Sequence, residues 1–74
     1  IETAAEIFAF SEAQKRLAHE VSNGLGLTDA AEALGISVNT ARTHLTRIYA
    51  KTGVNSQVAL VRMLMSMAAL PYQA

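Results

Sequence analysis

The side chains best suited to chemistry lie on one face of a segment that runs from about residue 38 to residue 51. In a helix, with about 100° between successive residues, the outward face of this segment and its edges carry five hydrogen-bonding side chains: Asn39, Arg42, Thr43, Thr46 and Arg47. None is acidic, and none is large and apolar. Short polar side chains allow close approach to base edges, and an arginine can donate two hydrogen bonds to guanine O6 and N7. This face therefore predicts a helix that reads bases in the major groove of DNA.

Residues nearer the rim of the same helix would lie beside phosphates. The predicted backbone contacts are Ser37, Thr40, His44 and Lys51. His44 has a second interpretation, as a residue that packs between helices. The whole face also has a plainer explanation, because most amphipathic helices turn a polar face to solvent. The lack of acids on this face, and the tight turn that precedes it, favour DNA reading.

Four helices and no strand are expected to position that face, because apolar residues recur at helical spacing and do not alternate with polar ones. Ser11 and Gln14 have the spacing of a capping box that opens the first helix. The other three helices are predicted at about residues 27–34, 38–51 and 56–69. Gly35 lies in the tight turn between the second and the third. The predicted fold class is all-α, a four-helix helix-turn-helix domain with its recognition helix at about 38–51.

Apolar stripes on the first three helices indicate which faces form the core. The predicted core residues are Ala13, Leu17, Ala18, Val21, Ala30, Ala31, Leu34, Val38, Ala41, Leu45, Ile48 and Thr52. Ala30 and Ala31 stand out because small side chains let another helix cross closely.

The last helix is apolar almost all round, with two stripes that need a partner. One stripe holds Val61, Leu64, Met65 and Ala68, and the other holds Leu60, Met63 and Met67. An all-round apolar helix is expected to be buried on two faces. One hypothesis makes Leu60, Met63 and Met67 an isologous dimer contact. The alternative is that residues 1–9, with Ile7, Phe8 and the adjacent Phe10, fold back over the second stripe. The sequence leaves open which stripe faces inward.

The charges are unevenly distributed, although the 74-residue chain has no formal net charge. Residues 1–32 hold all six acids but only two of the six bases, so residues 33–74 carry a net charge of +4. This asymmetry indicates an anionic partner for the second half.

Several other classes of protein find no support in the sequence. The chain has no cysteine, which excludes disulfides and thiolate metal sites. His19 and His44 have no ligand cluster around them, so no metal is expected. No nucleophile and base are arranged for catalysis. We therefore expect neither an enzyme nor a cofactor.

The length indicates one domain, predicted at residues 10–70. Residues 1–9 are expected to be a linker or an N-terminal extension, and residues 71–74 a tail. No secretory leader and no apolar stretch of about 20 residues is present. We expect a cytoplasmic protein with no membrane contact. The chain starts with Ile1 rather than Met, which suggests a fragment of a longer protein.

The sequence from residue 10 to residue 65 resembles the LuxR-type (GerE-like) helix-turn-helix family of bacterial transcriptional regulators. The matching residues are Ser11, Gln14, Gly24, Leu25, the segments 31–37, 39–45 and 48–54, and Leu60 with Val61. The resemblance implies sequence-specific binding to double-stranded promoter DNA, usually as a homodimer. It also implies a sensor domain N-terminal to this chain.

The chain departs from the family pattern at several positions. Asp29-Ala30 stand where the family usually has Glu-Ile, and Ala41 and Thr52 replace Val and Leu. Gln57 replaces an arginine often found there, which puts one phosphate contact in doubt.

A second function stays open. The same fold could act as a protein-interaction module that binds RNA polymerase or a regulatory partner. The zero net charge and the light core support this alternative.

Overall fold

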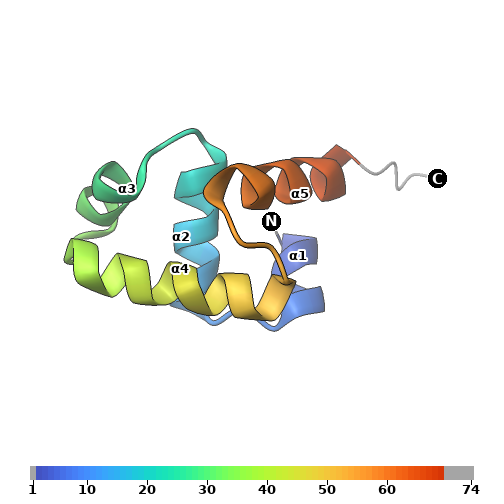
Figure 1. Cartoon of the computed structure of the whole chain (residues 1–74), viewed down its shortest axis with the longest axis horizontal. Coiled ribbons are helices and arrows are strands. Elements are labelled where there is room, and N and C mark those ends of the chain that lie inside the picture. Colours follow the sequence, from blue (N-terminus) through green and yellow to red (C-terminus); the bar gives the residue numbers. More distant parts are fainter. Residues whose placement is uncertain (1, 70–74) are drawn as a thin grey trace.

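A computed structural model describes residues 2–69 of the chain, which form five helices and no strand (Figure 1). The helices are α1 (Glu2–Phe8), α2 (Glu12–Ser22), α3 (Leu27–Leu34), α4 (Val38–Thr52) and α5 (Gln57–Ala69). The all-α class is confirmed, and so are the four predicted helices. The added helix, α1, lies within residues 1–9, where the sequence suggested a linker or an extension. The tail predicted at 71–74 lies outside the described residues.

The helices enclose one core. In Figure 1, α4 and α5 extend along the long axis, α2 crosses between them, and α3 and α1 lie at opposite ends. The core residues are Ala4, Leu17, Ala18, Val21, Ala30, Ala31, Ala41, Leu45, Ile48, Leu60 and Leu64. α3 and α4 contribute three alanines to this core, which allows the two helices to approach closely.

The ends of the helices follow the signals in the sequence. The capping box at α2 is present: Gln14 N–H donates to Ser11 Oγ (3.2 Å), and Ser11 N–H donates to Gln14 Oε1 (3.0 Å). At α4, Ser37 Oγ accepts a hydrogen bond from Thr40 N–H (3.0 Å). Gly35 has φ of 70°, a left-handed conformation that suits glycine at a helix end.

Some predicted core positions were wrong. Ala13 is exposed, and its neighbour Gln14 is buried instead, with 5% of its surface accessible. The apolar stripe favoured Ala13, but the capping box turns the Gln14 side chain back over the end of the helix. Leu34, Val38 and Thr52 are only partly buried.

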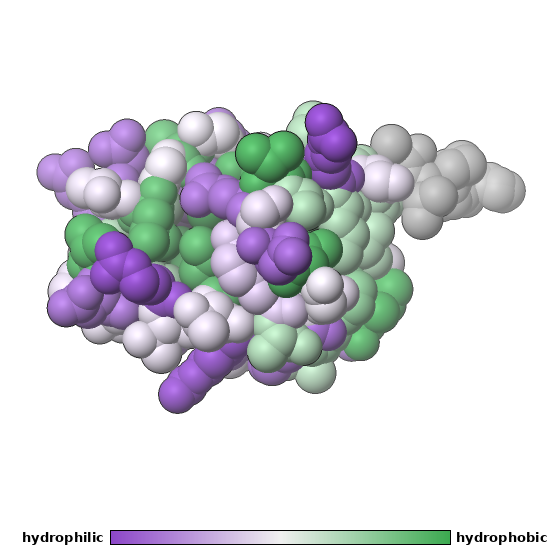
Figure 2. Space-filling model, viewed as in Figure 1, coloured by the Kyte–Doolittle hydropathy of each residue, from purple (hydrophilic) through white to green (hydrophobic). Residues whose placement is uncertain are grey.

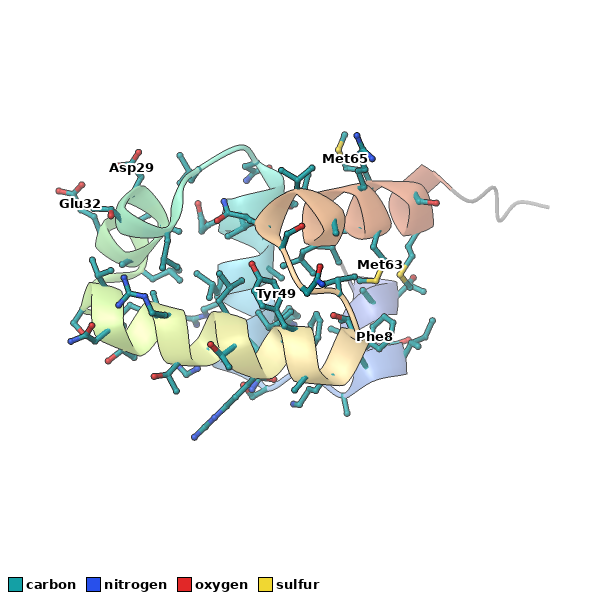
Figure 3. All side chains as sticks on the ribbon, in the orientation of Figure 1. Phe8, Asp29, Glu32, Tyr49, Met63 and Met65 are labelled. Atoms are coloured by element: carbon teal, nitrogen blue, oxygen red, sulfur yellow. The ribbon has the colours of Figure 1, made fainter. Side chains whose placement is uncertain are left out.

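The α5 helix turns Leu60 and Leu64 inward, one residue from each predicted stripe. Leu60 is fully buried, so the prediction that it contacts a second chain was wrong. Met63 and Met67 are partly buried against the core. The physical reason is that α2 and α1 both pack on α5. In Figure 3, Met63 points toward α1 whereas Met65 points away from the body.

The orientation of α5 can be tested by paired truncations. Leu60→Ala should lower the free energy of unfolding by about 2–5 kcal/mol, because it opens a cavity in the core. Met65→Ala, at a side chain that is 60% exposed, should change it by less than about 0.5 kcal/mol. Urea unfolding followed by circular dichroism measures both. An equal loss in the free energy of unfolding for the two variants would contradict the observed orientation of α5.

Candidate nucleic-acid interface

The outward face of α4 is built by the turn that precedes it and by the core behind it. Ala41, Leu45 and Ile48 are buried against α2 and α3, which leaves the opposite face of the helix in solvent. The Gly35 turn and the Ser37 cap set where α4 begins. The described residues therefore have the helix-turn-helix arrangement, with α4 as its second helix.

The structure brings the five predicted base contacts together. Asn39, Arg42, Thr43, Thr46 and Arg47 are all exposed and line one depression of about 390 Å³ on α4. No acidic side chain lines this depression. A surface that offers hydrogen-bond donors and positive charge without acids matches the base edges and phosphates of a DNA groove.

Two hydrogen bonds organise the N-terminal part of this face. Arg42 Nη1 donates to Asn39 Oδ1 (3.0 Å), and the Thr43 hydroxyl donates to the Asn39 carbonyl oxygen (3.1 Å). Arg47, one turn further along, forms no hydrogen bond or ion pair with residues 3–67, whose side chains the structure describes. Its guanidinium keeps all its donors for a ligand.

Ser37 and Thr40 form a pair at the rim. The Ser37 hydroxyl accepts from Thr40 N–H and donates to Thr40 Oγ1 (2.9 Å). A hydroxyl has one proton to donate, so the proton of Ser37 is already used. The Thr40 hydroxyl accepts that bond and keeps its own proton, which makes it the better phosphate donor of the two.

His44 occupies a groove between α2, the turn after α3, and α4. The groove has a volume of about 350 Å³ and is lined by Glu12, Ala13, Arg16, Leu34, Ile36 and His44. His44 is partly buried, and its Nδ1 is buried without a hydrogen-bond partner among the described residues. This position favours packing between helices over contact with a phosphate.

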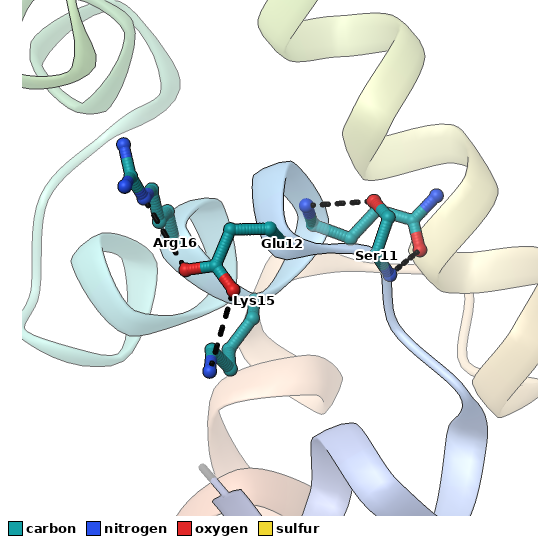
Figure 4. Close-up of polar contacts among 5 residues, drawn as sticks. Ser11, Glu12, Lys15 and Arg16 are labelled. Carbon is teal, nitrogen blue, oxygen red and sulfur yellow. Dashed lines mark hydrogen bonds and ion pairs between the residues drawn. The ribbon is translucent and has the colours of Figure 1, made fainter.

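Glu12, on the α2 side of this groove, pairs with two neighbouring cations. Its carboxylate lies 3.6 Å from the Lys15 ammonium and 3.4 Å from the Arg16 guanidinium, as Figure 4 shows beside the capping box. The Glu12–Arg16 pair is exposed to solvent, where such contacts contribute little to stability. The two pairs reduce the positive charge on that side of α4.

Lys51 makes contacts within the chain that the sequence did not reveal. Its ammonium donates to the Ala9 carbonyl oxygen (2.7 Å) and to Gln14 Oε1 (2.6 Å). These bonds use two of its three N–H donors and join the end of α4 to the α1–α2 junction. Only the third N–H donor of Lys51 is available to contact a phosphate. Because the partners lie 42 and 37 residues away, no local pattern could have shown this role.

Gln57, which replaces the arginine common in the family, also has an internal partner. Its Nε2 donates to the Leu25 carbonyl oxygen (3.2 Å) and ties the start of α5 to the loop before α3. Tyr49 is partly buried on α4, and this burial raises the pKa of its phenol. It therefore stays neutral near pH 7.

Two other kinds of site find no support in residues 2–69. No three His, Asp or Glu side chains lie close enough to hold a metal ion. None of the helices in this range has the length and apolarity that crossing a bilayer requires.

A compact set of helices that presents an acid-free helix after a tight turn defines a helix-turn-helix DNA-binding domain. The chain belongs to the LuxR family of bacterial regulatory proteins, whose GerE model matches residues 9–64. This is a family of DNA-binding regulators rather than of enzymes. The helix α1 precedes the matched region.

The chain is similar to three bacterial proteins described as HTH-type transcriptional regulators, one from Mycobacterium bovis and two from strains of Mycobacterium tuberculosis. Each is 51% identical over 41 residues, which is 55% of this chain and 5% of the relative. The chain thus spans a small part of the length of these relatives. No solved structure matches it.

The role of Lys51 can be tested by its removal. Lys51→Met should lower the free energy of unfolding by about 1–2 kcal/mol, because two charge-assisted hydrogen bonds are lost. The slope of log affinity against log salt should change by well under one, because only the third donor of Lys51 is left for a phosphate. If Lys51 instead neutralised a phosphate, the slope of log affinity against log salt would fall by about one. Urea unfolding and a salt titration of duplex binding separate the two roles.

Proposed function

We propose that this chain is the DNA-reading output domain of a bacterial transcriptional regulator, with α4 lying in the major groove of promoter DNA. The observation that carries the proposal is the acid-free face of α4, on which five exposed side chains share one depression. Asn39, Arg42, Thr43, Thr46 and Arg47 contact base edges. Thr40 donates to a phosphate. Ser37, His44 and the third donor of Lys51 make lesser contributions to the backbone contacts.

The distribution of charge supports this orientation. The acids of the helix-turn-helix unit are on α3, where Asp29 and Glu32 project from the side away from α4 (Figure 3). The α4 helix contains Arg42, Arg47 and Lys51 and no acid. A phosphate backbone that approached α4 would therefore meet positive charge, although the whole chain is neutral.

We also propose that the DNA-bound form is a homodimer that uses the outer face of α5. Val58 is 64% exposed and Met65 is 60% exposed, and they lie about two turns apart on the same side of α5. Val58 and Val61 line a groove of about 340 Å³ together with Val21 of α2, Gly24 in the loop after α2, and the polar Gln57 and Arg62. Figure 2 shows apolar surface over α5. Apolar surface of this kind marks an interaction site, and these residues replace Leu60 as the expected contact.

The regulator as a whole is proposed to be longer than this chain. The matched region makes up 5% of each relative. Most of the sequence of these relatives therefore lies outside the region that is similar to this chain. We propose that a sensor domain lies N-terminal to this chain and that the protein acts in the bacterial cytoplasm. RNA polymerase is a further proposed partner.

The exposed face of α5 also favours one alternative, a protein-interaction module that binds a regulatory partner through this face. The dependence of binding affinity on salt concentration distinguishes the two functions. DNA affinity should fall by nearly one log unit per log unit of salt for each phosphate neutralised, whereas an apolar protein interface should respond weakly.

The experiment that tests the proposed function is selection from a random duplex library at low and near-physiological salt. Enrichment of a palindrome with half-sites about one helical turn apart supports a dimeric, sequence-reading domain. Binding that enriches no sequence, or no DNA binding at any salt concentration, would contradict it.

A single substitution tests the base contacts. Arg47→Ala should weaken the preference for one base pair of the selected site by about 1–3 kcal/mol, because a bidentate contact to guanine is lost. Arg62→Ala, on α5, is the matched control and should leave the preference at every base pair unchanged. Competition binding with single-base variants of the site measures both effects. An equal loss of affinity for all duplexes would place Arg47 on the backbone instead.

The dimer has its own test. Met65→Glu should weaken self-association on DNA, because the charge would be buried in the contact between the two chains. Helicity should be unchanged, since Met65 is exposed within one chain. Analytical ultracentrifugation with a palindromic duplex should show one chain per duplex instead of two. Two variant chains bound at wild-type affinity would exclude this face.

A further inference from the structure

The large apolar side chains that the domain leaves in solvent lie on two helices that contact each other. Among residues 3–67, they are Ile7 on α1 (62% exposed) and Val58 and Met65 on α5 (64% and 60% exposed). The two helices pack on each other, and Met65 points away from the body of the domain (Figures 1 and 3). Exposed apolar side chains that are confined to two neighbouring helices indicate an interaction surface.

The outer side of α5 combines apolar side chains with one cation. Val58, Arg62 and Met65 follow one another at spacings of four and three residues, so they lie along the same side of the helix. Arg62 is exposed, and it forms no hydrogen bond or ion pair with residues 3–67. No acid is present anywhere on α5. The charge of this side is therefore not neutralised within its own helix.

A symmetric contact between two copies of this side of α5 would bring like charges together. In an isologous contact, the centre of the face meets its own copy. Arg62 lies at that centre, between Val58 and Met65, so two guanidinium groups would face each other. Like charges that face each other in an interface oppose association. The surface that fits α5 is therefore an apolar one that carries an acid.

The exposed side of α1 has this chemistry. Thr3, Glu6 and Ile7 are exposed, and the spacings of three and four residues put them on one side of the helix. Glu6 forms no hydrogen bond or ion pair with residues 3–67, and α1 contains no base. The Lys51 ammonium donates to the Ala9 carbonyl oxygen (2.7 Å) and fixes the end of α1 to the domain. The helix therefore presents an unpaired acid beside an exposed apolar side chain.

We propose that α1 of one chain packs on α5 of a second copy, with Glu6 opposite Arg62 and Ile7 against Val58 and Met65. The contact is reciprocal, so each dimer contains it twice. The inference rests on the proposed homodimer, and it names the surface of the second chain that α5 meets. It also gives a role in assembly to α1, which precedes the region that the LuxR family model matches.

Reversal of charge tests the pairing of Glu6 with Arg62. Glu6→Arg and Arg62→Glu should each weaken self-association by about tenfold, because each variant places two pairs of like charges in its dimer. An equimolar mixture of the two variants should regain the wild-type affinity, since both contacts of the mixed dimer again join opposite charges. Glu32→Arg is the matched control. It makes the same change of charge at an exposed position of α3, and self-association should be unchanged.

Sedimentation equilibrium of the 74-residue chain measures the dissociation constant of the dimer, first without DNA and then on the palindromic duplex that library selection yields. Circular dichroism first confirms that the variants are as helical as the wild type, as expected for exposed positions. Arg62→Met is measured as well. This variant should weaken association if Arg62 pairs with Glu6, and it should strengthen association if Arg62 faces its own copy.

The outcomes separate the inference from the proposed function. Unchanged association of Glu6→Arg, or stronger association of Arg62→Met, would overturn the inference while a selected palindrome still supports DNA reading. Self-association that shows the expected charge dependence in a chain that enriches no DNA sequence would support the inference and contradict the proposed function. A chain that is monomeric both when free and on its duplex, or monomeric when free with no sequence enriched, would overturn the α1–α5 contact together with the homodimer.

Discussion

The arrangement of this domain depends on the close contact of α4 with the helices behind it. Three of the buried side chains between α3 and α4 are alanines, and α4 adds Leu45 and Ile48. Small side chains permit a short distance between helix axes, and interior packing fixes the rotation of each helix. The rotation of α4 about its axis decides which residues face outward. The chemistry of the exposed face is thus set by apolar groups that no ligand touches.

A second, polar contact fixes the other end of α4. The Lys51 ammonium meets the Ala9 carbonyl and the buried Gln14 amide, and the same amide oxygen caps α2 through Ser11. One buried side chain therefore links the start of α2, the end of α1 and the last turn of α4. Ala9 has a φ of 56°, an unusual conformation for alanine that these contacts offset. The helix α1, which lies outside the family match, is joined in this way to the proposed recognition helix.

The two exposed faces of the domain differ in chemistry. The outer face of α4 offers donors and positive charge, whereas the outer face of α5 offers Val58 and Met65. The first suits an anionic, hydrogen-bonding partner and the second an apolar one. The acids lie on neither face, since α4 and α5 contain none. A domain with no net charge can thus bind an anion, because the position of its charges matters more than their sum.

The sequence by itself determined the helices α2 to α5 and the caps at which they begin or end. Caps, left-handed glycines and apolar periodicity act between residues a few positions apart, so Ser11, Gly35 and Ser37 could be interpreted without a structure. The exposed face of α4 was predictable for the same reason. Tertiary structure alone decided which residues of α5 are buried, because both stripes are apolar and the choice depends on how α1 and α2 pack on this helix. It also decided the role of Lys51 and the burial of Gln14, since their contacts join segments that are far apart in the chain and meet only after packing.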